Sequence, residues 1–135
     1  MLLSSKTISS IKLLIELGEH YSSDEYVSLN DVSKRKGLSK KFLEQIVPIL
    51  KQSGLIICLR GNQGGYKLSK KPKDITLKEI LNLTESVFDR CDSSSQAIDQ
   101  VMKELDEKID EYITKTTLQD LIDKEISSYS NSYII

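Results

Sequence analysis

Apolar residues in the first part of the chain recur at steps of three and four positions, the spacing that lines one side of a helix. The first such stripe predicts a helix over residues 5–20, and its members are Ile8, Ile11, Leu14, Ile15 and Leu17. A second helix is predicted to begin after Ser28, an N-cap residue with Asp31 three positions later, and to end at Gly37. A third helix is predicted over residues 39–50. Two helices joined by a short turn that contains glycine are typical of a helix-turn-helix.

After Gly54 the pattern changes from helical to β. Two short runs rich in β-branched and aromatic residues, 55–59 and 66–69, flank the glycine-rich segment 60–65 and predict a hairpin. Pro48 lies inside the preceding helix and is expected to kink it or loosen a turn near Glu44 without ending it. A fourth helix is predicted from Asp74 or Thr76, and a polar loop follows it.

The longest apolar stripe predicts one helix from residue 97 to about residue 115. Its members are Ile98, Val101, Met102, Leu105, Ile109, Tyr112 and Ile113. The other elements are too short to cover so long a stripe, so we expect it to pack against the same helix of a second copy. The alternative is that the helix folds back on its own domain. A short helix is predicted after Thr117, followed by a frayed end.

These elements predict a mainly α fold with a small β-hairpin (α+β), namely a winged helix-turn-helix plus a long C-terminal dimerisation helix. The expected organisation is a winged domain over residues 1–86 and a loop over 87–96. The dimerisation helix and the short helix follow over 97–126, and a flexible tail over 127–135.

The net charge of −1 conceals an asymmetry between the two ends of the chain. Residues 1–78 contain 14 Lys and Arg against 7 Asp and Glu, whereas residues 79–135 contain 5 against 13. A basic half of this kind favours a polyanionic partner; the alternative is that both halves simply have solvated charged surfaces. No apolar run is long enough to cross a membrane, and no cleavable signal is recognisable. With only Cys58 and Cys91, we expect no disulfide or metal framework and a cytoplasmic protein.

Candidate DNA contacts lie on the third helix and in the hairpin loop. A recognition helix reads base edges with its N-terminal residues, where Lys suits guanine or phosphate, Gln suits adenine and Glu suits cytosine. Glycines in the loop would let its backbone approach a phosphate, and an arginine at its base suits the minor groove. The predicted DNA-contacting set is Ser28, Ser39, Lys40, Lys41, Glu44, Gln45, Arg60, Gly61, Asn62, Gln63, Gly64, Gly65 and Tyr66. The single histidine, His20, has no evident catalytic partner, so we expect no enzyme activity.

The segments LNDVS (29–33), LSKKFLEQI (38–46), RGNQGGYKL (60–68) and ITLKEI (75–80) together resemble the Rrf2 family of bacterial transcription regulators. The likeness runs over residues 4–86 and continues at 116–121. It implies a homodimeric repressor that binds palindromic double-stranded DNA, with a long helix crossing its mate.

The sensor region departs from the family pattern. Cluster-binding members carry three closely spaced cysteines before the long helix, whereas residues 88–95 keep only Cys91, so we expect no iron–sulfur cluster and no other cofactor. The closer resemblance is to the clusterless branch, which implies control of cysteine or sulfur genes and a partner such as cysteine synthase. Two alternatives stay open: a winged-helix module for protein contacts without DNA, and a redox sensor that uses the Cys91 thiol.

Overall fold

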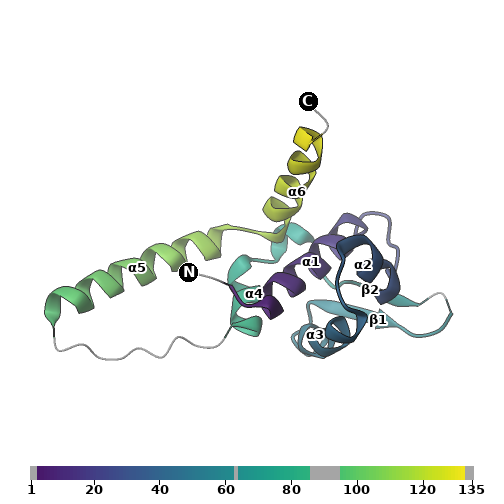
Figure 1. Ribbon diagram of the computed structural model, residues 1–135, viewed down its shortest axis with the longest axis horizontal. Coiled ribbons are helices and arrows are strands. Elements are labelled where there is room, and N and C mark those ends of the chain that lie inside the picture. The colour runs from purple at the N-terminus through teal and green to yellow at the C-terminus, as the bar shows by residue number, and fades with distance from the viewer. Residues whose placement is uncertain (1–2, 63, 86–94, 133–135) are drawn as a thin grey trace.

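The computed structural model describes residues 3–62, 64–85 and 95–132, with side chains described as far as residue 129. Within these residues the fold contains six α-helices, a short 3-10 helix and one antiparallel hairpin (Figure 1). This confirms the predicted α+β class. The elements are α1 (Ser5–Glu19), α2 (Leu29–Lys36), α3 (Lys40–Gln52), β1 (Ile56–Leu59), β2 (Gly65–Leu68), η1 (Pro72–Asp74), α4 (Leu77–Thr84), α5 (Gln96–Lys115) and α6 (Leu118–Ser132). No helix in the described part is both long and apolar enough to cross a bilayer.

Side-chain caps define where the helices of the helix-turn-helix begin. The Ser28 hydroxyl accepts a hydrogen bond from the Asp31 N–H at 3.2 Å, and the Ser39 hydroxyl accepts one from Phe42 at 3.3 Å. Gly37 ends α2 in the left-handed conformation, with φ of 66°. Helix α3 then continues through the exposed Pro48 to Gln52, so proline does not end it.

The core is shared between the N-terminal elements and the C-terminal helix. Leu13, Leu14 and Leu17 of α1 are fully buried, and they pack with side chains from α2, α3, the hairpin and α4. Leu118 and Ile122 of α6 belong to the same cluster and are 0% and 4% exposed. The predicted winged domain over residues 1–86 therefore does not contain the whole core, because part of the core comes from α6.

Helix α5 extends away from this core, and α6 begins at the core and points away from it in another direction (Figure 1). No side chain of α5 is buried, and its contact with the body runs through α4, where Lys78 pairs with Asp110 at 2.7 Å. The alternative in which this helix folds back over its own domain is therefore wrong. Helix α6 is also longer than predicted, because residues 127–132 are helical where a frayed tail was expected.

The start of α1 is tied to the end of α4 by a carboxylate. Glu85 Oε1 accepts hydrogen bonds from the Thr7 hydroxyl at 2.5 Å and the Ser4 N–H at 2.8 Å. These bonds favour the ionised form, so they lower the pKa of Glu85. The side chains of Thr7 and Thr84 are buried, and their hydroxyl oxygens lie 2.7 Å apart.

We expect Glu85→Gln to flatten the acid side of the stability profile. A lowered folded-state pKa contributes stability that is present above the unfolded-state pKa and is lost as the pH falls through the folded-state value. The parent should therefore lose more stability than the variant between about pH 5 and about pH 3. Urea unfolding at a series of pH values measures this. Glu25→Gln, in an exposed loop, is the control, and identical profiles for the parent and Glu85→Gln would contradict the assignment.

Candidate nucleic-acid interface

One side of α3 is fixed in the core and the opposite side is free for a partner. Leu43, Ile46, Val47 and Leu50 are buried, which fixes the rotation of the helix about its axis. Five predicted contact residues on the first two turns are consequently exposed to solvent: Ser39, Lys40, Lys41, Glu44 and Gln45. The structure thus presents these side chains as the sequence predicted.

The hairpin forms the wing beside this helix. Strands β1 and β2 pair with Cys58 opposite Tyr66 and Leu59 opposite Gly65. The connecting loop exposes Arg60, Gly61 and Asn62, and Gly61 has a φ of 119°, which favours glycine. Gln63, also a predicted contact, lies outside the described residues. We call the exposed residues Lys40, Lys41, Glu44, Gln45, Arg60 and Asn62 the reading surface.

Two glycines of the wing are required by internal packing. A Cβ on Gly64 would lie 2.0 Å from the Leu59 carbonyl oxygen, and one on Gly65 would lie 2.5 Å from the Val27 carbonyl oxygen. Both neighbours are backbone atoms, which cannot move aside cheaply. The predicted reason for these glycines was approach to a phosphate, whereas the structure gives them a role within the protein.

The wing is fastened to the segment that leads into α2. Val27 and Tyr66 exchange two backbone hydrogen bonds, each 2.8 Å long. The Tyr66 ring is half-buried against the core, and this burial raises the pKa of its hydroxyl. Cys58 and Glu44 raise that pKa further, and Arg60 lowers it, so Tyr66 experiences charges from both α3 and the wing loop. The wing is thus bonded to the segment before α2, and its strand β1 packs against α3, so the helix-turn-helix and the wing form one unit.

The sequence did not reveal a buried carboxylate at the back of this unit. Glu16 is 3% exposed and lies 2.6 Å from Arg35 Nη1, 3.9 Å from Lys36 Nζ and 4.0 Å from His20 Nδ1. Its hydrogen bond raises the pKa of Arg35, and Lys36 also reaches Glu125 on α6 at 3.7 Å. Two cations at the end of α2 are therefore engaged within the protein. The one sequence signal is that Glu16 interrupts the apolar run 13–17, which marks a possible buried charge but does not identify its partners.

The donor set does not fit an iron–sulfur cluster. Such clusters are usually held by four cysteine thiolates, and the sequence has two cysteines. Cys58 is half-buried on β1, and Cys91 lies outside the described residues. The part of the chain that the structure describes holds no group of three or more His, Cys, Asp or Glu side chains able to bind a metal.

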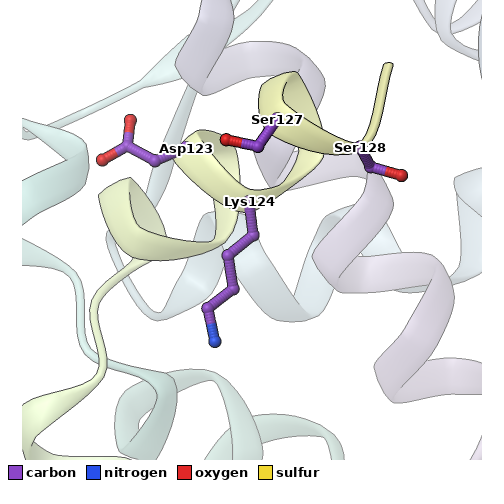
Figure 2. Close-up of a pocket in the computed structure, with 4 residues that line it drawn as sticks. All are labelled: Asp123, Lys124, Ser127 and Ser128. Carbon is purple, nitrogen blue, oxygen red and sulfur yellow. The ribbon is translucent and has the colours of Figure 1, made fainter. Parts of the chain in front are cut away.

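A hollow of about 420 Å³ along α6 offers no convergent chemistry. Figure 2 shows its lining residues Asp123, Lys124, Ser127 and Ser128, all of which belong to the same helix. The Lys124 side chain points away from the Asp123 carboxylate. A single helix face of this kind does not surround a ligand.

An exposed basic helix held at a fixed distance from a glycine-containing wing defines a winged helix-turn-helix regulator that binds DNA. A family model described as the iron-dependent transcriptional regulator Rrf2 matches residues 3–124. The chain belongs to the Rrf2 family, whose members regulate transcription and are not enzymes.

Individual relatives agree with this assignment. The chain is 28% identical over 134 residues to the HTH-type transcriptional regulator IscR of Pectobacterium atrosepticum, covering 93% of this chain and 81% of that protein. The solved structure of CymR, the global cysteine regulator of B. subtilis, has 28% identity and a TM-score of 0.83 over 92% of this chain and 98% of that one. IscR of T. potens has 29% identity and a TM-score of 0.78 over 93% and 88%.

Proposed function

We propose that the protein is a repressor that binds a palindromic operator as a homodimer. Helix α3 of each protomer would enter the major groove, and the wing would bring Arg60 to the adjacent minor groove. The observation that carries this proposal is the reading surface, which presents Lys40, Lys41 and Arg60 to solvent from two neighbouring elements, α3 and the hairpin whose strand β1 contacts it. Binding to the DNA upstream of its own gene, compared with random duplex in gel shifts, tests it.

The exposed stripe of α5 supports the homodimer. Ile98, Val101 and Tyr112 are 54%, 61% and 58% exposed, and Met102 and Leu105 are 45% and 48% exposed. Ile109 and Ile113 are half-buried toward the end of the helix that contacts α4. An apolar stripe of this length in water favours burial against a partner. A second α5 crossing it by two-fold symmetry would place two α3 helices for half-sites about 34 Å apart.

Lys40→Ala and Gln45→Ala should have different effects on DNA binding. Loss of Lys40 removes a phosphate contact from each protomer, so it should weaken binding to all DNA sequences alike. It should also reduce the slope of log affinity against log salt concentration by about 0.9 per lost contact. Loss of Gln45 removes a base contact, so it should lower the preference for the operator over a single-base variant by about 10-fold. Gel shifts at two salt concentrations measure both effects.

The control for these two variants is Lys124→Ala, an exposed lysine on α6. It should leave both the salt slope and the sequence preference unchanged. If Lys40→Ala altered the affinity no more than Lys124→Ala does, α3 would not be the reading element.

The rival function is a winged-helix module that binds proteins and not DNA. Such a module has no need to expose Lys40, Lys41 and Arg60 together beside a wing. The observed exposure of these cations therefore favours DNA. If the protein bound no duplex more tightly than random DNA, at both low and moderate salt, that result would support the rival.

A link to cysteine metabolism is proposed from the likeness to CymR, which is described as a global cysteine regulator. A regulatory partner such as cysteine synthase would then associate with the chain in the native host. Co-purification of the tagged protein, read by mass spectrometry, tests this: recovery of cysteine synthase with the wild type but not with an unrelated tagged protein is the expected result.

A thiol sensor at Cys91 is a second candidate, supported by the position of this residue where cluster-binding relatives are expected to hold cysteines. The expected result for anaerobically purified protein is a colourless sample without stoichiometric iron. Cys91→Ser should then abolish any effect of peroxide on operator affinity, whereas Cys58→Ser should not.

A further inference from the structure

We infer that Ser33 positions the first turn of α3 for DNA reading, an inference that rests on the proposed function. Ser33 lies on α2, about one turn before that helix ends, and its side chain is half-buried. It is not one of the reading-surface residues. Its side chain instead spans the turn of the helix-turn-helix and joins the end of α2 to the residue that precedes the cap of α3.

Three hydrogen bonds connect Ser33 with this turn. Its carbonyl oxygen accepts one from the N–H of Gly37 and one from the N–H of Leu38, the latter at 3.2 Å. Bonds of this kind are usual where a helix ends at a left-handed glycine. The Ser33 hydroxyl adds a third bond, because its Oγ donates to the Leu38 carbonyl oxygen at 2.5 Å. A glycine cap does not need this third bond, which depends on the serine side chain alone.

The acceptor of the third bond lies at the start of the reading helix. Leu38 directly precedes Ser39, the N-cap of α3. The first carbonyl used by that helix is the one of Ser39, which accepts from the Leu43 N–H at 3.0 Å, so the Leu38 carbonyl is free for Ser33. The Leu38 side chain is half-buried against the core. Its backbone and its side chain together fix the direction in which α3 begins.

The first turn of α3 depends on this connection more than the later turns do. Ser39, Lys40 and Lys41 are all exposed, and the first buried side chain of α3 is that of Leu43. Core packing therefore holds the later turns, whereas the first turn is held by the segment before it. A recognition helix contacts base edges with its N-terminal residues, so the direction of this turn decides which edges they reach.

The end of α2 that carries Ser33 is itself bonded to the body of the protein. Arg35 and Lys36 lie 2.6 Å and 3.9 Å from the carboxylate of Glu16 on α1. Lys36 also lies 3.7 Å from the carboxylate of Glu125 on α6. The last turn of α2 is therefore a fixed support, and Ser33 connects the start of α3 to that support.

Amide hydrogen exchange of the full chain, followed by NMR without DNA, tests this connection. Ser33→Ala keeps the backbone bonds of the turn and favours the helical conformation of α2, so it removes only the hydroxyl. Exchange should become about 5-fold faster or more at Leu43, whose N–H closes the first bond of α3, and should stay unchanged at Leu50 in a later turn. Unchanged exchange at Leu43, or equal acceleration at Leu43 and Leu50, would overturn the role of Ser33.

The matched control is Ser23→Ala. Ser23 also donates its hydroxyl to a backbone carbonyl, that of His20 at 2.8 Å, but it lies in the exposed loop after α1. This substitution removes the same kind of bond from a place that does not hold α3. Exchange at Leu43 and DNA binding should therefore match the parent. Circular dichroism and the melting temperature show that each variant is folded.

Gel shifts then test the effect on DNA reading. Operator affinity relative to random duplex should fall by about 10-fold in Ser33→Ala, the size of one base contact, and should recover in Ser33→Thr, which keeps a hydroxyl. Affinity for random duplex should stay at the parent value, because Lys40 and Lys41 remain exposed to phosphates. A variant that was merely less folded would bind both duplexes more weakly by the same factor.

An unchanged ratio of the two affinities in Ser33→Ala would therefore overturn the role of Ser33 in DNA reading. A parent protein without any operator preference would instead contradict the proposed function. The exchange measurement would in that case still decide whether Ser33 holds the first turn of α3.

Discussion

Leu105→Glu is expected to convert the protein into a monomer and to reduce its operator affinity by at least about 100-fold. Leu105 lies in the middle of the α5 stripe and is 48% exposed in the protomer. In a two-fold dimer the substitution would place two carboxylates within one apolar seam, where an unpaired charge is strongly unfavourable. A monomer would then bind one half-site of the operator alone, with half of the DNA contacts that a dimer makes.

This variant separates assembly from folding unusually well. No side chain of α5 is buried in the protomer, so the core should remain intact and the circular dichroism spectrum should be preserved. Sedimentation analysis and gel shifts measure the two expected changes. Lys103→Glu, on the polar side of the same helix, is the matched control and should remain dimeric. A dimer that survives Leu105→Glu would show that α5 is not the interface.

Gly65→Ala should destabilise the protein by about 3 kcal/mol and weaken operator binding in the molecules that remain folded. The added methyl group would lie 2.5 Å from the Val27 carbonyl oxygen and 3.0 Å from the Ser28 nitrogen. Relief of this clash requires the wing to move away from Val27, which breaks the two hydrogen bonds between Val27 and Tyr66. It also disturbs Ser28, the residue that caps α2.

Gly18→Ala provides a control with a similar distance but a different neighbour. Its Cβ would meet Ile122 Cδ1 at 2.5 Å, which is the far end of a flexible side chain. Alanine also favours the helical conformation of this segment, so the net change should stay within about 1 kcal/mol. Urea unfolding measures both variants. Equal destabilisation by the two substitutions would contradict the backbone clash assigned to Gly65.

The sequence predicted the reading half of the molecule well because its signals are local. Ser28, Ser39 and Gly37 mark helix ends through contacts with their own neighbours in the chain, and these caps are present in the structure. The apolar spacing of α3 likewise fixed which side is buried, and hence that Lys40 and Gln45 are exposed. Capping residues and apolar spacing were sufficient for these features.

The features that sequence reasoning missed depend on contacts between distant segments. Glu16 looked like an ordinary charged helix residue until α2 placed Arg35 and Lys36 beside it, with Lys36 shared with Glu125 of α6. The pairing of Val27 with Tyr66, which explains Gly65, joins positions on either side of the whole helix-turn-helix. No local pattern encodes such pairings. DNA contact by the predicted residues and the role of Cys91 remain predictions.

The burial of Leu118 and Ile122 beside α1 has a consequence for the order in which the molecule matures on the ribosome. Domains generally fold as units during synthesis, starting from the N-terminus. Here the unit that holds α3 cannot complete its core until the start of α6 has emerged from the ribosome, and all of α5 emerges before it. A nascent chain therefore lacks a closed core around α3 for most of its synthesis, and α5 is already complete when that core closes.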